Sequence, residues 1–488
     1  MNPTKVQIEE IKSGFTYMQT PEDLVKLLNL AKPIIYGAKS IPFKLKDVSF
    51  YCNPKRTQSI YEFSNQYTEF KIKKKSGGHR AIHAPKKGLK AIQRTFTFVL
   101  QCIFEPHKAA MGFVKKRSIV DNAKLHINSR YVYNIDLKDF FPSIDQARLW
   151  KCLQLQPFNL NKETSRNLEM LKWDDFEIKF PQQSSQLKKK YTQFLKFKDN
   201  NDSKNDVSAK SLQGIQIPFL KREKLEAKYV YFDLETTYYR VTPYLLKESR
   251  IELANWISAI CCTELEVERI NEQSGDVELV KRNVLPQGAP TSPVITNIIC
   301  QRMDLLLTGV AKRFGLLYSR YADDLTFSSL HNVYQKDGEF IKELHRIISE
   351  QGFRINISKT RLQKDGYKKE VTGLLVHNQV NVQKKYIKEI RKWLYYWETY
   401  GYEKASIIYS NNYFEKPPLK NVLLGKLDFL KMVKGKDNST FILLKSRFDL
   451  LNKSKKVNEI RTDHLNQTLD LLLSDGLDKS MEFYQPRK

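Results

Sequence analysis

The sequence predicts an α+β fold in which antiparallel strands carry acidic side chains and are flanked by helices. Three observations predict it: a strand pattern over 131–137, a hairpin pattern over 317–330, and helical hydrophobic spacing in the segments around them. The chain has 488 residues, of which 41% are hydrophobic, so burial can offset the entropy lost on folding. At roughly 150 residues per domain, this length suggests about three domains.

The first expected elements are a helix, a pair of strands and a second helix. Thr20 is a typical N-cap and Pro21 a typical first helical residue, so a helix is expected to begin there. Residues 61–82 are expected to form two strands around a basic loop, 73–78, whose glycine pair suits a tight turn. A helix is expected over 89–104.

Residues 131–137 form a predicted strand that carries a carboxylate. Because side chains alternate along a strand, Val132, Asn134 and Asp136 are expected on one face and the residues between them on the other. Asp136 is therefore expected on the open face of an otherwise buried strand. The alternative is that Asp136 only caps the turn that follows.

Residues 156–240 differ in composition, with patches rich in Gln, Lys, Asn, Asp and Ser. We expect an insertion with a flexible middle, followed by a β-prone stretch over 229–239. After a turn rich in Pro and Gly, Ser292 is the expected N-cap and Pro293 the first residue of a helix. That helix is expected to bury residues four positions apart, which are Ile295, Ile299, Met303 and Leu307.

The hairpin over 317–330 has the sequence Tyr321-Ala322-Asp323-Asp324 at its expected turn. Tyrosine and phenylalanine flank it, so the two adjacent acids are expected where burial is common. Like charges in such a place oppose folding, and a metal ion would neutralise them.

The chain is strongly basic, with 82 Lys and Arg against 54 Asp and Glu, a formal charge of +28. Such an excess indicates an anionic partner, either nucleic acid or a membrane surface. Residues 71–90 hold eight basic and no acidic residues, although a solvated loop would show the same pattern.

The six cysteines form no C-x-x-C pair and the histidines form no cluster. We therefore expect reduced thiols, and we expect neither a zinc site nor a disulfide framework. Any metal is expected to have oxygen ligands, which favours Mg²⁺ or Mn²⁺. No apolar run approaches the roughly 20 residues that span a bilayer, and residues 1–10 lack a secretory signal pattern. A cytoplasmic protein without a membrane partner is expected.

Three carboxylates, a basic loop and a large positive charge together favour nucleotidyl transfer. In that chemistry two metal ions activate a hydroxyl group and stabilise the leaving pyrophosphate, and acids from separate strands hold them. Asp136 and Asp323 are expected to bridge both ions, with Asp324 in a secondary role.

Three motifs occur in a fixed order along the chain: Asp136-Leu137-Lys138-Asp139-Phe140-Phe141, Leu285-Pro286-Gln287-Gly288 and Tyr321-Ala322-Asp323-Asp324. Together they resemble the palm of a reverse transcriptase. The segments Gln287-Gly288-Ala289-Pro290, Asn122-Ala123-Lys124-Leu125-His126 and Val371-Thr372-Gly373 are most similar to those of bacterial retron reverse transcriptases. Residues 156–240 and the tail depart from the family pattern.

The resemblance implies a right-hand polymerase fold, with fingers, a palm built on a ferredoxin-like antiparallel sheet with helices, and a helical thumb. The implied regions are an N-terminal helical region over 1–50, fingers over 51–130, palm over 131–155 and 241–380, the insertion over 156–240, thumb over 381–455 and a tail over 456–488.

The resemblance also implies roles for single residues. Catalytic acids are Asp136, Asp323 and Asp324, and Leu137 joins them in holding two Mg²⁺ ions, for which Mn²⁺ can substitute. Nucleotide contacts are implied for Lys73, Arg80, Gln287, Lys359 and Phe141, the last as a steric gate against ribose. Contacts to nucleic acid are implied for Lys74, Lys75, Asn122, His126, Tyr321, Lys384, Lys385, Lys388 and Arg391.

Several of these residues have simpler interpretations. Lys73 can be interchangeable surface charge, and Asn122 and His126, four residues apart, can bond each other or a backbone group. The basic helix of the thumb, in which Trp393 and Tyr396 suit nucleic-acid contacts, can instead be a solvated amphipathic helix.

The implied function is RNA-directed DNA synthesis of the retron type. A cognate structured non-coding RNA would be template and primer, deoxynucleoside triphosphates the substrates, and RNA-linked single-stranded DNA the product. A role in antiphage defence with a separately encoded effector protein is also implied. The alternatives are a non-retron defence reverse transcriptase that makes repetitive or untemplated DNA, and a catalytically inactive RNA-binding protein.

Overall fold

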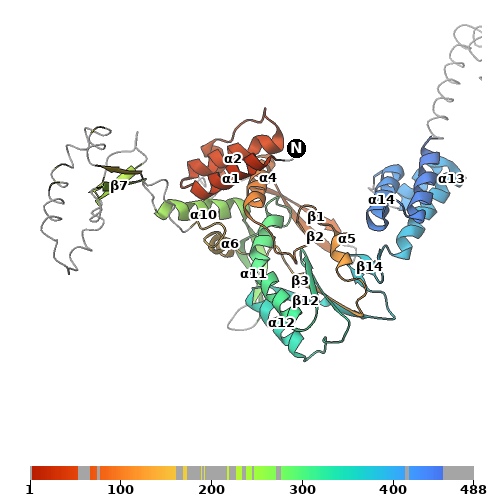
Figure 1. Ribbon diagram of the computed structural model, residues 1–488. Helices are drawn as coiled ribbons and strands as arrows, with labels where there is room; N and C mark the ends of the chain where they lie inside the picture. Colours follow the sequence, from red (N-terminus) through yellow and green to blue (C-terminus); the bar gives the residue numbers. More distant parts are fainter. Residues whose placement is uncertain are drawn as a thin grey trace, which may run out of the picture. The chain divides into compact units, whose positions relative to one another are not determined.

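The computed structural model describes residues 3–52, 66–73, 77–160, 247–270, 276–412 and 417–453, with the short pieces 169–172, 178, 188, 192, 217–218, 227–232 and 238–243. Many of its elements are labelled in Figure 1. The chain divides into two compact units. Unit 1 is Met1–His107 with Asp139–Arg302, and unit 2 is Lys108–Lys138 with Met303–Lys488. Both contain helices and antiparallel strands, which confirms the α+β prediction.

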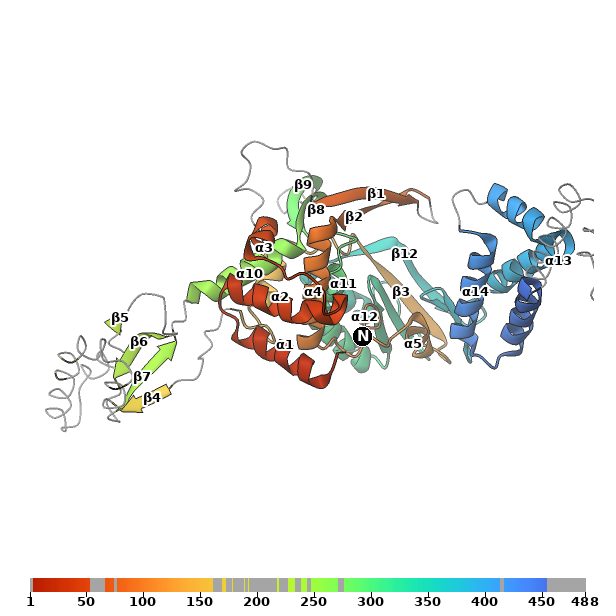
Figure 2. The same cartoon turned by 90° about the horizontal axis from the view of Figure 1, so that it is seen from above.

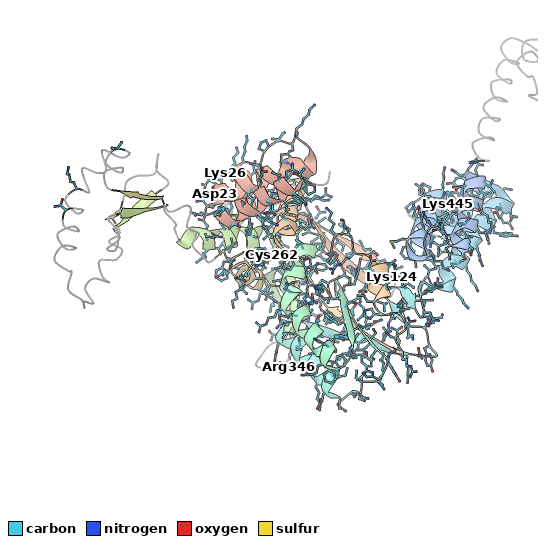
Figure 3. The ribbon with its side chains drawn as sticks, viewed as in Figure 1. Asp23, Lys26, Lys124, Cys262, Arg346 and Lys445 are labelled. Carbon is cyan, nitrogen blue, oxygen red and sulfur yellow. The ribbon has the colours of Figure 1, made fainter. Side chains whose placement is uncertain are left out.

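The helices of unit 1 are α1 (Lys5–Tyr17), α2 (Pro21–Tyr36), α3 (Leu45–Cys52), α4 (Lys87–Ile103), α6 (Gln146–Leu153) and α10 (Lys247–Cys261). As predicted, Thr20 caps α2: its hydroxyl accepts a hydrogen bond from Asp23 N, and the Asp23 carboxylate accepts one from Thr20 N. Figure 3 labels Asp23 and Lys26 of α2, whose Oδ1 and Nζ atoms lie 3.3 Å apart.

The described strands of unit 1 form three separate sheets. β1 (Tyr67–Lys73) pairs with β2 (His79–Pro85), as predicted, and β8 (Thr263–Ile270) pairs with β9 (Val277–Val284); both hairpins are visible in Figure 2. The third sheet has the order β4-β7-β6-β5, from Glu169–Lys172, Tyr238–Pro243, Ala227–Phe232 and Ile217–Pro218. The β-prone stretch of the insertion is thus confirmed, whereas its expected flexible middle lies outside the described residues.

Unit 2 is built on a four-stranded antiparallel sheet with the order β10-β11-β3-β12. The strands are β10 (Leu317–Tyr321), β11 (Asp324–Ser329), β3 (Tyr131–Lys138) and β12 (Arg354–Lys364). One face packs against α12 (Glu339–Glu350), where Phe327 contacts Phe340 with ring centroids 5.2 Å apart. Because Phe327 and Tyr133 are paired residues, this is the face that carries the odd-numbered residues of β3.

The other face of this sheet is covered at one end by α5 (Ile119–Lys124). The C-terminal elements of unit 2 are β13 (Glu370–Val371), β14 (Leu374–Val376), β15 (Val380–Asn381), α13 (Lys384–Asn412) and α14 (Leu419–Lys434). Helix α5 and these elements contribute to one hydrophobic core that includes Val120, Val132, Leu374 and Leu427. The predicted helical region after residue 380 is confirmed in the described residues; the tail over 456–488 lies outside them.

Helix α11 (Ser292–Arg313) buries Ile295, Ile299, Met303 and Leu307, as predicted. The N-cap prediction is wrong by one residue: α11 begins at Ser292, whose hydroxyl donates to Pro286 O instead of capping the helix. Among the described residues α11 alone is long and apolar enough to span a membrane. Since 67% of its most apolar window is buried in the protein, it matches the core helix of a globular domain.

All six cysteines are free thiols in this structure. Burial raises the pKa of Cys261 to about 12 and that of Cys152 to about 11, so both remain protonated at neutral pH. Cys262, labelled in Figure 3, is also buried and follows α10.

Candidate functional site

The centre of the candidate site is a row of three paired residues across three strands. Asp136 on β3 pairs with Asp324 on β11 on one side and with Asn356 on β12 on the other. Paired residues of antiparallel strands share a face, with Cβ atoms about 4.5–5.5 Å apart. We call Asp324, Asp136 and Asn356 the central row. Asp136 is thus not a cap of the next turn but the middle of a polar surface.

The two faces of β3 confirm the predicted alternation. Val132 is buried in the core beneath α5, and the Asn134 amide donates to Glu370 O at 2.7 Å. Asp136, two residues further along, lies beyond these covering elements and keeps partial solvent access. The same strand face therefore changes from apolar to acidic along four residues, and only its acidic end is open.

Asp323 lies in a two-residue turn between β10 and β11, and main-chain contacts hold this turn. Ala322 has a φ of 58°, the left-handed conformation that a tight hairpin requires. Leu137 N donates to Asp323 O at 3.0 Å, which ties the turn to β3. Gly112 lies so close that a Cβ there would be 2.5 Å from Ala322 N. A side chain at position 112 would therefore displace the acidic turn.

A buried ion pair supports the same hairpin, and sequence reasoning missed it. The Arg320 guanidinium donates to both oxygens of Asp304 on α11, at 2.8 and 2.6 Å, and both side chains are 0% exposed. Arg320 Nη1 also donates to Ala322 O at 3.3 Å, and the Tyr318 hydroxyl donates to Asp304 at 2.8 Å. The pair thus links the core helix to the backbone of the acidic turn.

Lys359 and Asn356 both bond the Asp136 carboxylate. Lys359 Nζ donates to Oδ1 and Oδ2 at 3.0 and 3.1 Å, and Asn356 Nδ2 donates to Oδ2 at 3.0 Å. Lys359 reaches Asp136 because the pairing of β12 with β3 shifts register between Asn356 and Arg361. Sequence reasoning selected Lys359 and missed Asn356.

The electrostatics of the site show that its carboxylates repel one another. Desolvation by surrounding protein, and then the charges of Asp323 and Asp136, raise the pKa of Asp324 to about 7. Asp324 is nevertheless exposed at its outer edge, so a dissolved cation can reach it. A cation placed here would relieve this repulsion.

The predicted nucleic-acid contacts Asn122 and His126 are wrong in this conformation, because both side chains are 0% exposed. The Ser319 hydroxyl donates to Asn122 Oδ1 at 2.6 Å and lies 2.7 Å from His126 Nε2, while His126 Nδ1 lies 2.7 Å from the Ser328 hydroxyl. The Ser319 hydroxyl has one hydrogen and donates it to Asn122. It can therefore only accept a hydrogen bond from His126, so His126 Nε2 must carry a hydrogen. Both residues therefore support the strands of the acidic hairpin from the sheet face that also carries Asp136.

The oxygen ligands of the site fit a hard divalent cation in their chemistry. Asp136 and Asp324 are side by side and Asp323 is on the adjoining turn, while the Leu137 side chain is buried and offers only its main-chain carbonyl. In the described part of the chain, no three Asp, Glu, His or Cys side chains already converge as a closed ligand set. A metal would therefore complete this arrangement by drawing the acids together.

The other predicted nucleotide-binding residues, Lys73, Arg80, Phe141 and Gln287, belong to unit 1. Gln287 O accepts a hydrogen bond from His83 N of β2 at 2.8 Å. Gly288 has a φ of 121°, and a Cβ there would be 2.8 Å from His83 O and from Ile82 Cγ2. The turn that carries Gln287 therefore packs directly on β2. Phe141 is half-buried, with its ring centroid 5.5 Å from that of Phe140.

Strand pairing separates the two predicted phosphate-binding residues. Lys73 pairs with His79, and Arg80 pairs with Ile72, so their side chains leave opposite faces of the β1–β2 hairpin. Arg80 shares its face with Ile82, the residue that contacts Gly288. Lys73 and Arg80 therefore cannot both contact a nucleotide from one face of this hairpin.

The remaining predicted contacts lie mainly on α13. Its first turns expose four basic side chains, Lys384, Lys385, Lys388 and Arg391. Trp393, in contrast, is 1% exposed and belongs to the core, so its expected nucleic-acid contact is wrong. Tyr396 is half-buried, with Lys392 Nζ 5.6 Å from its ring centre. Tyr321 is half-buried beside the acidic turn; Lys74 and Lys75 lie outside the described residues.

Comparison with known proteins identifies relatives over most of the chain. The family model Reverse transcriptase (RNA-dependent DNA polymerase) matches residues 72–185 and 180–379. Retron Mx162 reverse transcriptase of Myxococcus xanthus is 27% identical over 377 residues, 75% of this chain and 55% of the relative. Retron Mx65 reverse transcriptase of the same organism is 26% identical over 336 residues, 67% of this chain and 55% of the relative.

A third relative, Retron Ec86 reverse transcriptase of Escherichia coli, is 25% identical over 340 residues, 68% of this chain and 70% of the relative. The chain thus spans about half the length of the two Myxococcus relatives. Among solved structures, telomerase from Candida albicans is 14% identical with a TM-score of 0.35, covering 86% of this chain and 62% of that one.

Proposed function

Because the chain belongs to the reverse transcriptase (RNA-dependent DNA polymerase) family, we propose that it is an RNA-directed DNA polymerase of the retron type. One observation carries the proposal: Asp136 and Asp324 lie side by side at the open end of a sheet, next to a tight turn that holds Asp323. The retron reverse transcriptases among its relatives support the subtype.

The acids would hold two Mg²⁺ ions, which Mn²⁺ could replace. Such ions, when bound, activate the attacking hydroxyl and stabilise the leaving pyrophosphate. Asp136 and Asp323 would be the principal ligands, with Asp324 and the Leu137 carbonyl in support. Lys359, which already reaches Asp136 from the bulge of β12, would lie near the pyrophosphate and protonate it as it leaves.

Unit 1 would supply the nucleotide contacts. Arg80 and Gln287 would bind the incoming deoxynucleoside triphosphate, and the packing of the Gln287 turn against β2, the strand that carries Arg80, supports this assignment. Phe141 would exclude a ribose 2′-hydroxyl. In this proposal 51–130 are fingers, 131–155 and 241–380 palm, and 381–455 thumb, whose exposed basic side chains on α13 would bind the nucleic acid backbone.

The biological proposal follows from the retron relatives. A cognate structured non-coding RNA would be both template and primer, and the product would be single-stranded DNA linked to that RNA (msDNA). We place the protein in the cytoplasm, in antiphage defence together with a separately encoded effector protein.

Primer extension on an RNA template with Mg²⁺ tests the chemistry. Asp323→Asn should abolish synthesis while RNA binding stays near the wild-type value, because one metal ligand is lost and the binding surface is intact. Asp337→Asn, an exposed acid before α12, is the control with the same change in charge and should remain active. Equal synthesis by wild type and Asp323→Asn would rule out the catalytic assignment.

Sequencing the nucleic acid that co-purifies with the protein from its host tests the subtype. One defined DNA linked to one structured RNA supports the retron assignment. Long homopolymers or repeats would instead favour a non-retron defence reverse transcriptase, and RNA without DNA would favour an inactive RNA-binding protein.

A further inference from the structure

Asn356 is the one uncharged member of the central row and directly faces Asp136. Its Nδ2 donates to Asp136 Oδ2 at 3.0 Å, and its own Oδ1 accepts a hydrogen bond from the Ser358 hydroxyl at 2.8 Å. The Asp136 carboxylate can only accept hydrogen bonds, so it must face the amide NH₂ group, and the Ser358 hydroxyl donates to the amide oxygen. The amide orientation is thereby fixed by chemistry on both sides.

The backbone of Asn356 is fixed as well. Asn356 is the last residue of β12 in register with β3 before the pairing shifts, and the Thr360 hydroxyl donates to Asn356 O at 2.9 Å across the bulge. A side chain anchored at its backbone, its amide oxygen and its amide nitrogen has little freedom. It can therefore hold the plane of the Asp136 carboxylate.

Lys359 differs from Asn356 in the way it acts on Asp136. The ammonium is half-exposed, lies at the end of a flexible stem and touches both carboxylate oxygens, so it adds charge without selecting an orientation. The Asn356 amide touches only Oδ2 and brings no net charge that would oppose a divalent cation. Of the two partners, Asn356 is the one suited to orient the acid while leaving its charge available.

We infer that Asn356 is a positioning residue for metal binding: it holds Asp136 in the orientation in which that acid binds a divalent cation together with Asp324. The inference rests on the proposed two-metal site. Without the amide, the Asp136 side chain would have to be ordered by the cation itself, at a cost in metal affinity.

The test is a titration of the purified full-length protein with Mn²⁺ alone, in which electron paramagnetic resonance measures the free ion. Asn356→Ala should weaken the tightest Mn²⁺ binding by about tenfold, the order expected for the loss of one charge-assisted hydrogen bond. Asn356→Leu, which keeps the branched shape without the amide, should behave alike. Asn378→Ala is the matched control: it makes the same change at an exposed asparagine of unit 2 outside the central row and should bind Mn²⁺ like wild type.

A kinetic measurement separates positioning from a general structural role. In primer extension, Asn356→Ala should need about tenfold more Mg²⁺ for half-maximal rate, while kcat at saturating Mg²⁺ and KM for the nucleotide change by less than about threefold. Mn²⁺ affinities of both Asn356 variants equal to wild type would overturn the inference, as would an equal loss in Asn378→Ala. If wild type binds Mn²⁺ but makes no DNA, the proposed function fails, while the Mn²⁺ comparison still decides the role of Asn356.

Discussion

At the scale of single residues, the candidate site depends on buried polar groups that are almost fully partnered. Arg320 and Asp304 form a bidentate pair with no solvent contact, and His126 is bonded at both ring nitrogens. Removing one partner of a buried pair leaves an uncompensated charge, which typically costs about 3–5 kcal/mol. The acidic hairpin is thus supported by buried interactions whose loss would cost much of the free energy of unfolding.

His126 gives the protein a specific sensitivity to acid. Burial lowers the pKa of His126 from 6.5 to about 3, so between these values the unfolded chain binds a proton that the folded chain does not. The free energy of unfolding should therefore fall as the pH drops below about 6.5, by up to about 1.4 kcal/mol per pH unit from this residue.

Urea unfolding of wild type and His126→Gln at several pH values between 7 and 4.5 measures this contribution. Gln has a hydrogen-bond donor and an acceptor but does not titrate. The variant should have a lower free energy of unfolding at pH 7, and this free energy should fall less as the pH is lowered. Parallel pH dependence in the two proteins would show that His126 contributes nothing to acid sensitivity.

Residue roles were only partly predictable from the sequence. Asp136 and the acidic turn could be found because strand alternation and adjacent like charges are local patterns. Asn122 and His126 were assigned to the wrong surface, because a spacing of four residues does not say whether a helix face is buried. Asn356 was missed because its partner is 220 residues away and comes into reach only through strand pairing.

At the scale of elements, the β1–β2 hairpin distributes its basic residues over two faces. The pairing of Lys73 with His79 and of Arg80 with Ile72 follows from a continuous register without a bulge. Sequence alone predicted the two strands but not their register, because a shift of one residue would exchange the faces.

Arg80 and Lys73 should therefore differ in their effect on nucleotide use. We expect Arg80→Ala to raise KM for the deoxynucleoside triphosphate by roughly 10- to 100-fold, the loss of a charge-assisted hydrogen bond. Lys73→Ala, which removes an equal charge from the other face, should change KM by less than about threefold. Steady-state primer extension at varied nucleotide concentration measures both, and equal effects would contradict the assignment by faces.

At the scale of the whole molecule, the charge of +28 has a structural distribution that the sum did not reveal. Basic side chains are exposed along the first turns of α13. Arg320, in contrast, is buried, and its charge is balanced by that of Asp304. The positive charge that is available to a partner is therefore located on defined surfaces, and such surfaces can bind the phosphate backbone of a structured RNA.

RNA binding should weaken steeply as salt rises. If about six phosphates are neutralised, affinity should fall on the order of 10³-fold between about 50 and 200 mM monovalent salt. The double variant Lys384→Gln with Lys388→Gln should reduce the slope of log affinity against log salt by about 1.5 to 2. Filter binding or fluorescence anisotropy measures it, and a flat salt dependence would contradict the proposed role of the basic surface.

The central row has a last consequence, which concerns the order in which the protein is made. Asp136 is synthesised early, but its neighbours Asp324 and Asn356 follow only after a long segment, 139–302, that belongs to unit 1. Contacts between such distant positions form slowly, because the loop between them must first be closed. A nascent chain shorter than position 356 therefore lacks the complete row, so the proposed polymerase activity requires that β3, β11 and β12 have already paired.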